Sequence, residues 1–274
     1  MKILISADME GVAGVTHAQQ TRRDTSEFAR SCELMTGEVR AACESALRAG
    51  ATMVVVNDSH GDMRNIIHEQ LPPEVQLIQG SVKELSMIEG IDGSFDALVF
   101  VGYHAPAATR AGILDHTYHG RVVHKVLLNG DVCSEARLNA AVAGTFGVPA
   151  LFLSGDQSAC ADARRFLPWI VTATVKHALG RTAARALSPT AARAAIFNGI
   201  GEALAQIQQG AGQPYRLDPP ISIDLTCMNS EMADSAALLP GADRIDGTTV
   251  RYVADNTVTA FRAFRVMMTL AAAV

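Results

Sequence analysis

The amino-acid sequence predicts an α/β protein with a mostly parallel central sheet flanked by helices and an elaborated C-terminal α+β half. Segments 2–6, 52–56 and 97–101 are apolar nearly throughout, which is typical of parallel strands covered by helices on both faces. The first two enclose a segment with helical spacing, and such a β-α-β unit has a right-handed crossover. The order of helix and then strand returns between residues 135 and 153. Together these observations favour the α/β class.

The first helix is expected to begin at segment 24–27, which resembles a capping box, and to end at Gly50. Between them, apolar side chains recur at helical spacing. These side chains are Phe28, Cys32, Met35, Val39, Ala42 and Ala46. Further along, segment 122–128 predicts a strand that leads into a tight turn at Asn129 and Gly130.

The second half continues with helices and strands in a less regular order. Residues 135–146 predict a helix and 148–153 a strand, and the alanine-rich segment 189–209 predicts another helix. We also expect strands over 221–226 and 248–253, and a last helix, capped by Asp255 or Asn256, that extends through Ala271.

The composition excludes several classes of protein. The chain has 274 residues and is 49% apolar, 19% charged and 5% aromatic, which excludes a disordered chain, a collagen and a coiled coil. Its 23 basic and 28 acidic side chains are scattered and give a net charge of -5, so we expect no nucleic-acid partner. No run approaches the roughly 20 apolar residues of a membrane span, and we expect no membrane partner.

The cysteines and the first residues bear on the compartment. Five cysteines are widely spaced without a C-x-x-C pair, which is typical of reduced thiols. Asp8 follows only a short apolar stretch, so we expect no signal peptide. The expected location is the cytoplasm.

Polar side chains collect directly after the predicted strands. Asp8 and Glu10 follow the first strand, His60 follows the second, and His104 follows the third. Because the carboxyl ends of parallel strands meet at one edge of a sheet, these side chains are expected to converge. Two carboxylates and two imidazoles suit zinc or another divalent transition ion. Any one of them alone is more often a cap, a turn residue or a surface group, and only their coincidence favours a shared metal site.

The other histidines divide into two groups. His68, placed in a helix, His124, placed in a strand, and His177, placed on a polar turn, are expected to be structural or solvated. His116 follows the third strand and could overhang the same edge, with His119 as a weaker rival. His17 stays open.

Four of these motifs, in this order and spacing, resemble the DppA-type zinc-dependent D-aminopeptidase family. They are segments 6–11, 56–60, 102–105 and 135–140. The resemblance extends through nearly the whole chain and implies a metallo-aminopeptidase with two zinc ions per chain. It implies Asp8 as the residue that bridges the two ions, and Glu10, His60, His104 and Glu135 as the other ligands. Glu135 rests on the resemblance alone, since spacing does not favour it over Asp131.

The resemblance also assigns roles outside the ligand set. His116 corresponds to the catalytic histidine, although Asp115 and Thr117 depart from the small hydroxyl residues that flank it in the family. A hydroxide activated by the two ions is the expected nucleophile, and His116 relays a proton or stabilises the oxyanion; direct attack by His116 is the less economical alternative. Asn139 and Lys176 are secondary candidates for substrate binding, or else they cap or solvate helices.

The substrates implied by the resemblance are short peptides, with D-amino acids at the N-terminus. It further implies a homo-oligomer in the form of a ring, such as a ring-shaped decamer. We treat residues 1–274 as a single unit. A subdivision near residue 156 would separate a metal-binding core, 1–156, from a C-terminal half, 157–274, that contributes to the substrate pocket and to oligomer contacts.

Two alternatives remain open at this point. Acids and histidines at strand ends also suit another metal-dependent hydrolase, either an amidase or a phosphoesterase, although the chain has no G-N-H motif followed by an acid. A protein that binds a small molecule without catalysis is the other alternative.

Overall fold

A seven-stranded sheet forms the centre of the protein in the computed structural model, which describes every residue except Gln209 and Ala211. Its strand order is β3-β2-β1-β4-β7-β8-β9, and all neighbours are parallel except β9, which runs antiparallel to β8 at one edge. The strands are β1 (Lys2–Ala7), β2 (Met53–Asp58), β3 (Val75–Ile78), β4 (Ala97–Tyr103), β7 (Ala150–Asp156), β8 (Val171–Gly180) and β9 (Ala183–Ala186).

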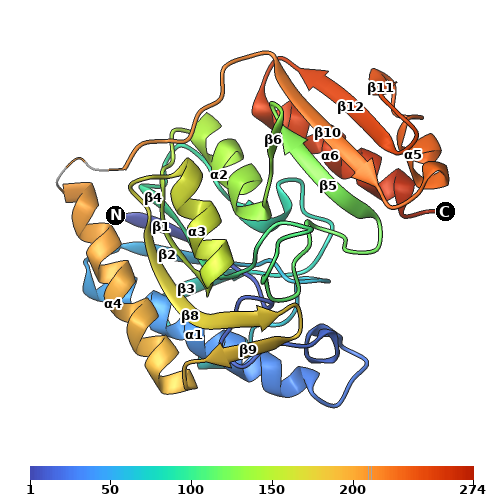
Figure 1. Ribbon diagram of the computed structural model, residues 1–274. Helices are drawn as coiled ribbons and strands as arrows, with labels where there is room; N and C mark the ends of the chain where they lie inside the picture. Colours follow the sequence, from blue (N-terminus) through green and yellow to red (C-terminus); the bar gives the residue numbers. More distant parts are fainter. Residues whose placement is uncertain (209, 211) are drawn as a thin grey trace.

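Helices cover both faces of this sheet (Figure 1). Helices α1 (Phe28–Arg48) and α4 (Pro189–Gln208) pack on one face, and α2 (Glu135–Thr145) and α3 (Gln157–Phe166) pack on the other. Along β1 the buried side chains alternate between two hydrophobic clusters, since Ile3 and Ile5 belong to one and Leu4 to the other. This alternation is the period of two that a strand buried on both faces requires.

A second, five-stranded sheet is antiparallel and has the order β11-β12-β10-β5-β6. It packs against α6 beside α2, and shares a single hydrophobic cluster with the α2 face of the large sheet (Figure 1). Its elements are β5 (Val123–Leu128), β6 (Asp131–Val132), β10 (Ile221–Cys227), β11 (Ala242–Arg244), β12 (Thr249–Ala254), α5 (Ser230–Ala236) and α6 (Thr257–Ala271). Three short 3-10 helices, η1 (Ala18–Thr21), η2 (His68–Gln70) and η3 (Ser86–Ile88), lie in connections.

The predicted fold class is confirmed, and the predicted strands match β1, β2, β4, β5, β7, β10 and β12 to within a few residues. Asn256, not Asp255, caps the last helix, because its side chain accepts a hydrogen bond from the backbone N–H of Thr259 at 2.9 Å. The predicted helix over 189–209 matches α4 as far as Gln208, and Gln209 lies outside the described residues.

Two local predictions are wrong. Segment 24–27 does not form a capping box: α1 begins at Phe28 without a side-chain cap, and Asp24 instead binds the guanidinium of Arg22 at 2.6 Å. His177 does not lie on a polar turn but inside β8, where its pairing with Arg185 of β9 forms an edge hairpin. Polar residues alternate with apolar ones in this segment because the strand is buried on one side only, and this pattern resembles that of a polar turn.

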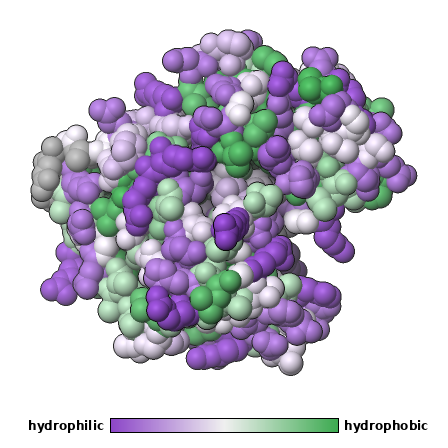
Figure 2. Space-filling view, viewed as in Figure 1, coloured by the Kyte–Doolittle hydropathy of each residue, from purple (hydrophilic) through white to green (hydrophobic). Residues whose placement is uncertain are grey.

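The seven-stranded sheet takes strands from both sides of residue 156, because β7 ends there and β8 lies beside it. The division of the chain at this point stays a prediction. Hydrophilic residues cover most of the face seen in Figure 2, and the hydrophobic residues form small separate patches. Among the described residues, no helix combines the length and the hydropathy needed to cross a bilayer.

Candidate metal centre

The loop that follows β1 carries two of the predicted ligands, Asp8 and Glu10, and both side chains are buried. Lys176 of β8 holds this loop from behind. Its ammonium donates hydrogen bonds to the carbonyl oxygens of Glu10 at 2.5 Å, Val12 at 2.8 Å and Val15 at 2.5 Å. Because an ammonium has three N–H donors, the three carbonyls use all of them.

Gly102 allows the ends of β1 and β4 to approach closely. Its φ is +72°, and a Cβ atom there would lie 2.2 Å from the carbonyl oxygen of Asp8. Only glycine adopts this conformation freely and leaves room for the neighbouring backbone. The close approach brings His104, which follows β4, beside Asp8.

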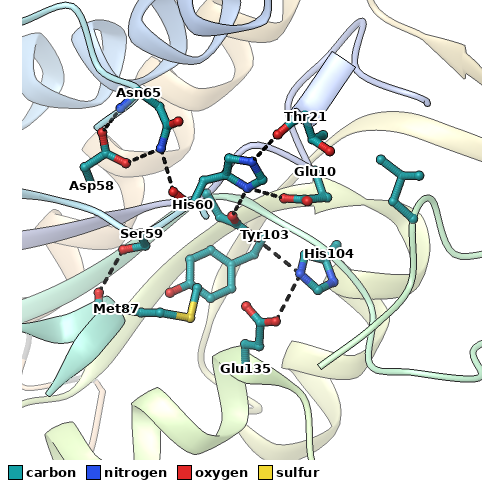
Figure 3. Close-up of polar contacts among 12 residues, drawn as sticks. Glu10, Thr21, Asp58, Ser59, His60, Asn65, Met87, Tyr103, His104 and Glu135 are labelled. Carbon is teal, nitrogen blue, oxygen red and sulfur yellow. Dashed lines mark hydrogen bonds and ion pairs between the residues drawn. The ribbon is translucent and has the colours of Figure 1, made fainter. Parts of the chain in front are cut away.

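Asp58, at the end of β2, organises the loop that carries His60. Its carboxylate accepts hydrogen bonds from the backbone N–H groups of Asn65 at 2.5 Å and Ile66 at 2.8 Å. The Asn65 amide donates both to Asp58 and to the carbonyl oxygen of His60, each at 2.7 Å. The loop therefore folds back on itself and directs the imidazole towards the end of β1 (Figure 3).

Glu135 comes from the other side of the site, as the first residue of α2. Ser134 caps this helix by accepting a hydrogen bond from the backbone N–H of Arg137 at 3.2 Å. One carboxylate oxygen of Glu135 accepts a hydrogen bond from the backbone N–H of Tyr118 at 2.6 Å. A carboxylate at the start of a helix is further stabilised by the helix dipole.

The five predicted ligands meet in one buried cluster. Figure 3 labels four of them, Glu10, His60, His104 and Glu135. Nδ1 of His60 lies 2.9 Å from Oε2 of Glu10 and 3.4 Å from Oδ1 of Asp8. Nε2 of His104 lies 3.4 Å from the other Asp8 oxygen, Oδ2, and 3.3 Å from Oε1 of Glu135. Asp8 therefore presents one carboxylate oxygen to each half of the cluster.

Backbone carbonyls fix the tautomers of the two histidines. Nε2 of His60 lies 2.9 Å from the carbonyl oxygen of Thr21, and Nδ1 of His104 lies 3.0 Å from that of Ala105. Since a carbonyl oxygen can only accept, these ring nitrogens carry the proton in a neutral imidazole. The opposite nitrogen of each ring then directs its lone pair at the carboxylates, which is the usual arrangement of a metal-ligating histidine.

The three carboxylates of the cluster require nearby positive charge. Burial and the neighbouring charge of Glu10 raise the pKa of Asp8 to about 7. Burial lowers the pKa of His104, but the carboxylates of Glu135, Asp8 and Glu10 together outweigh this effect and raise that pKa to about 10. The pKa of His60 rises well above its ordinary value in the same way, since the carboxylates of Glu10 and Asp8 together outweigh the effect of burial.

These donors fit metal ions. Oδ2 of Asp8 and Nε2 of His104 are buried and have no hydrogen-bond partner in the described part of the chain. Ligand atoms of Asp8, Glu10 and His104 lie within 4.8 Å of one another, and so do those of His104, His116 and Glu135. Carboxylate oxygens and imidazole nitrogens in two such groups match the donor set of zinc.

His116 lies against the second group of ligands. Its ring stacks on that of His104 with the centroids 4.1 Å apart, and its Nε2 lies 3.8 Å from Oε1 of Glu135. Nδ1 of His116 lies 2.8 Å from the carbonyl oxygen of Leu114, so the proton of the neutral ring is on Nδ1. Burial and the neighbouring His104 lower the pKa of His116. The neutral ring therefore presents a free lone pair on Nε2.

A cavity of about 720 Å³ opens in front of the cluster. Glu10 and His116 line it, together with Tyr118, His119 and Leu114. Its volume falls within the range of sites that bind small molecules. The cavity therefore gives a small polar ligand access to the predicted metal ligands.

The two predicted substrate contacts, Asn139 and Lys176, are fully buried and do not line this cavity. Asn139 donates a hydrogen bond to the hydroxyl of Tyr103 at 3.0 Å and accepts one from the hydroxyl of Tyr118 at 3.1 Å. Lys176 directs its ammonium at the loop after β1. Asn139 therefore contacts the cavity only through Tyr118, a residue that no sequence pattern indicates.

Known proteins with similar sequences and structures share one description. The sequence pattern of the peptidase M55 family, described as D-aminopeptidase, matches residues 1–266. A D-aminopeptidase from Bacillus subtilis (strain 168) is 36% identical over 276 residues, which cover 99% of this chain and 98% of that protein. The solved structure of the Zn-dependent D-aminopeptidase DppA from Bacillus subtilis, described as a self-compartmentalizing protease, has a TM-score of 0.96 at 34% identity and covers 100% of this chain and 99% of its own.

Proposed function

Because the chain belongs to the D-aminopeptidase family M55, we propose that it is a zinc-dependent aminopeptidase that releases N-terminal D-amino acids from short peptides. The observation that carries this proposal is the buried cluster in which Asp8 lies between a His60 half and a His104 half. The substrate class rests on the names of the relatives. The cluster itself supports hydrolysis assisted by metal ions.

Two zinc ions per chain are the arrangement that these donors favour. Glu10 and His60 would hold one ion, His104 and Glu135 the other, and Asp8 would contribute one oxygen to each. This division follows the observed pairing of the side chains. When bound, a pair of zinc ions lowers the pKa of water and polarises a carbonyl group.

His116 holds or moves a proton at Nε2 during the reaction. Its lowered pKa keeps the ring neutral near pH 7, so that Nε2 accepts a proton and later returns it to the leaving amine. The hydrogen bond from Nδ1 to the carbonyl oxygen of Leu114 keeps the ring in this orientation. A charged His116 would instead stabilise the negative oxygen of the tetrahedral state.

The cavity supports short substrates with a free amine. Glu10 both belongs to the metal cluster and lines the cavity, so the free amine of a peptide would be held beside it, by a bound zinc ion or by a nearby carboxylate. The backbone of the substrate then lies along the wall formed by Leu114 and Tyr118. An extended peptide of two or three residues, about 7 to 11 Å long, is short enough for such a cavity.

The location and the assembly belong to the same proposal. All five cysteines are free thiols, which supports a reducing compartment such as the cytoplasm. The relative of known structure is called self-compartmentalizing. On that basis we propose a homo-oligomer, in the form of a ring such as a decamer, that encloses the catalytic sites.

A metal analysis combined with a substrate panel tests the proposed function. The purified protein, supplemented with zinc and then dialysed, is expected to hold two zinc ions per chain. It should release alanine from D-Ala dipeptides and act weakly or not at all on the matched L-Ala dipeptides. Hydrolysis of phosphoesters with no action on either set of peptides would identify a phosphoesterase. A protein that binds no zinc and hydrolyses nothing would be a binding protein.

A further inference from the structure

Three arginines line the cavity in addition to the metal-binding side chains: Arg22, Arg121 and Arg181. None of the three has a role in the metal cluster or in the proton transfer proposed for His116. Guanidinium groups in this cavity offer positive charge and N–H donors to an anionic group of the substrate. The free carboxylate of a short peptide is such a group.

Two of the three arginines already have carboxylate partners. Arg22 binds Asp24 through two hydrogen bonds of 3.1 and 2.6 Å. Arg181 binds the carboxylate of Asp115 at 2.9 Å and its carbonyl oxygen at 3.2 Å. Arg121 is exposed and forms no ion pair or side-chain hydrogen bond with the described residues. Arg121 is therefore the cavity arginine whose donors are available to a ligand.

The backbone around Arg121 is fixed although its side chain is exposed. The N–H groups of Val122 and Val123 both donate to the carbonyl oxygen of His119 at 2.9 Å, and the carbonyl oxygen of Val122 accepts from the N–H of Met228 at 2.9 Å. These bonds tie the turn to the start of β5 and to the five-stranded sheet. The guanidinium thus extends into the cavity from an anchored position.

A dipeptide is short enough for its amine and its carboxylate to lie in this one cavity. Two extended residues span about 7 Å, so a dipeptide with its amine at the metal cluster keeps its carboxylate within a cavity of this size. A carboxylate in a partly dry cavity requires hydrogen-bond donors. A guanidinium is suited to this task because it donates two parallel N–H bonds to both carboxylate oxygens.

We propose that Arg121 binds the C-terminal carboxylate of the peptide substrate and so makes the enzyme selective for short peptides with a free C-terminus. This inference rests on the proposed aminopeptidase function. Arg121 takes no part in the bond cleavage and acts through binding alone. Its loss should therefore raise KM and leave kcat nearly unchanged.

The test compares two substrates that differ only at the C-terminus, D-Ala-Gly and D-Ala-Gly amide, with the zinc-loaded enzyme. Release of D-alanine is measured for the wild type, Arg121→Ala, Arg121→Lys and Arg110→Ala. Arg110 is a matched control because it is exposed, belongs to the same segment between β4 and β5, and does not line the cavity. If the wild type prefers L-alanine, the corresponding L-peptides are used.

We expect Arg121→Ala to raise KM for the free acid about tenfold, as for the loss of a partly exposed charged hydrogen bond, while kcat/KM for the amide stays within about twofold. Arg121→Lys should retain part of the preference, and Arg110→Ala should behave as the wild type. Equal effects on both substrates, or a wild type that does not distinguish them, would overturn the carboxylate site and leave the aminopeptidase function intact. A wild type that cleaves neither peptide would overturn both.

Discussion

Three backbone carbonyls determine how the histidines of the site can act. Those of Thr21 and Ala105 accept from the rings of His60 and His104, so that the opposite ring nitrogens face the carboxylates. The carbonyl of Leu114 does the same for His116, but the free nitrogen of that ring lies farther from Glu135, at 3.8 Å. This longer distance supports the proposal that His116 handles a proton while His60 and His104 bind metal.

Substitutions should separate these roles. Asp8→Ala and His104→Ala are expected to abolish turnover and to lower the zinc content, because each removes a donor from the buried cluster. His116→Ala is expected to lower kcat by about 100-fold or more, as for the loss of a general acid or base, with the zinc content retained. Metal analysis and peptide hydrolysis on the same preparations measure both effects. Loss of zinc in the His116 variant would place that residue among the ligands.

A buried acid near the site should make stability depend on pH. Burial raises the pKa of Glu38 from 4.5 to about 7, against the lowering effect of the N–H group of Ala13. The folded state therefore holds the Glu38 proton more tightly than the unfolded state. The contribution of Glu38 to the free energy of unfolding is fully present below pH 4.5 and is lost as the pH rises through 7. At about 1.4 kcal/mol per pKa unit, the loss is about 3 kcal/mol.

The variant Glu38→Gln isolates this effect, because an amide does not titrate and its oxygen can still accept from the N–H of Ala13. Urea unfolding at pH 5 and pH 8 should show the wild type losing stability relative to the variant at the higher pH. A difference between the two proteins that is independent of pH would contradict the raised pKa.

Four of the five side chains in the metal cluster could be predicted from their positions directly after strands. Glu135 could not, because it arrives from α2, and nothing in the spacing of residues 131 to 135 says which acid faces the strand ends. The position of Lys176 could not be predicted either. A lysine is usually exposed, but this one is buried because its ammonium donates to three carbonyls of the β1 loop and is attracted by the carboxylates of Glu38 and Asp156.

Among the elements, the loop after β1 depends on a residue that is 166 positions away along the chain. We expect Lys176→Met to weaken zinc binding about 10- to 100-fold, the usual effect of losing a group that orients a ligand, because Glu10 loses its anchor. Titration with a competing chelator measures this, with circular dichroism as a check that the variant is folded.

Ser45→Ala is the matched control for this variant. The Ser45 hydroxyl also donates to a backbone carbonyl, that of Phe197 at 2.6 Å, but between α1 and α4 and away from the site. The Ser45→Ala variant should be less stable than the wild type but should bind zinc equally well. If Lys176→Met binds zinc normally, the lysine serves stability alone.

The central strands could be predicted because they are buried on both faces and therefore uniformly apolar. Strand β8 could not, since Thr172, Thr174 and Lys176 interrupt its apolar residues. The start of α1 was predicted too early, because Asp24 has the composition of a cap but its carboxylate forms an ion pair with Arg22. In both places a tertiary contact overrides the local pattern.

At the scale of the whole molecule, the α/β class could be predicted, but the pairing of β5 with β10 could not. These strands are about a hundred residues apart, and no local signal joins them. The five-stranded sheet that they form shares its core with the α2 face of the large sheet. The two sheets are therefore expected to unfold together.

The assembly can be tested on the intact protein. Light scattering should give a mass that is a multiple of the 29.0 kDa chain, in line with a ring-like homo-oligomer. Contacts between chains in such an assembly bury apolar surface, so the mass should persist in high salt. A monomer at micromolar concentration would contradict the proposed enclosure of the sites.

Glu135 follows the β5–β6 hairpin of one sheet and faces the strand ends of the other. A cation bound there would link the five-stranded sheet to the seven-stranded sheet. Zinc binding would then increase the free energy needed to separate the two sheets. This increase would grow with the logarithm of the free zinc concentration. Removal of zinc would therefore first loosen the contact between the two sheets. Amide hydrogens at the start of α2 would then exchange faster, while those of the central strands would still be protected.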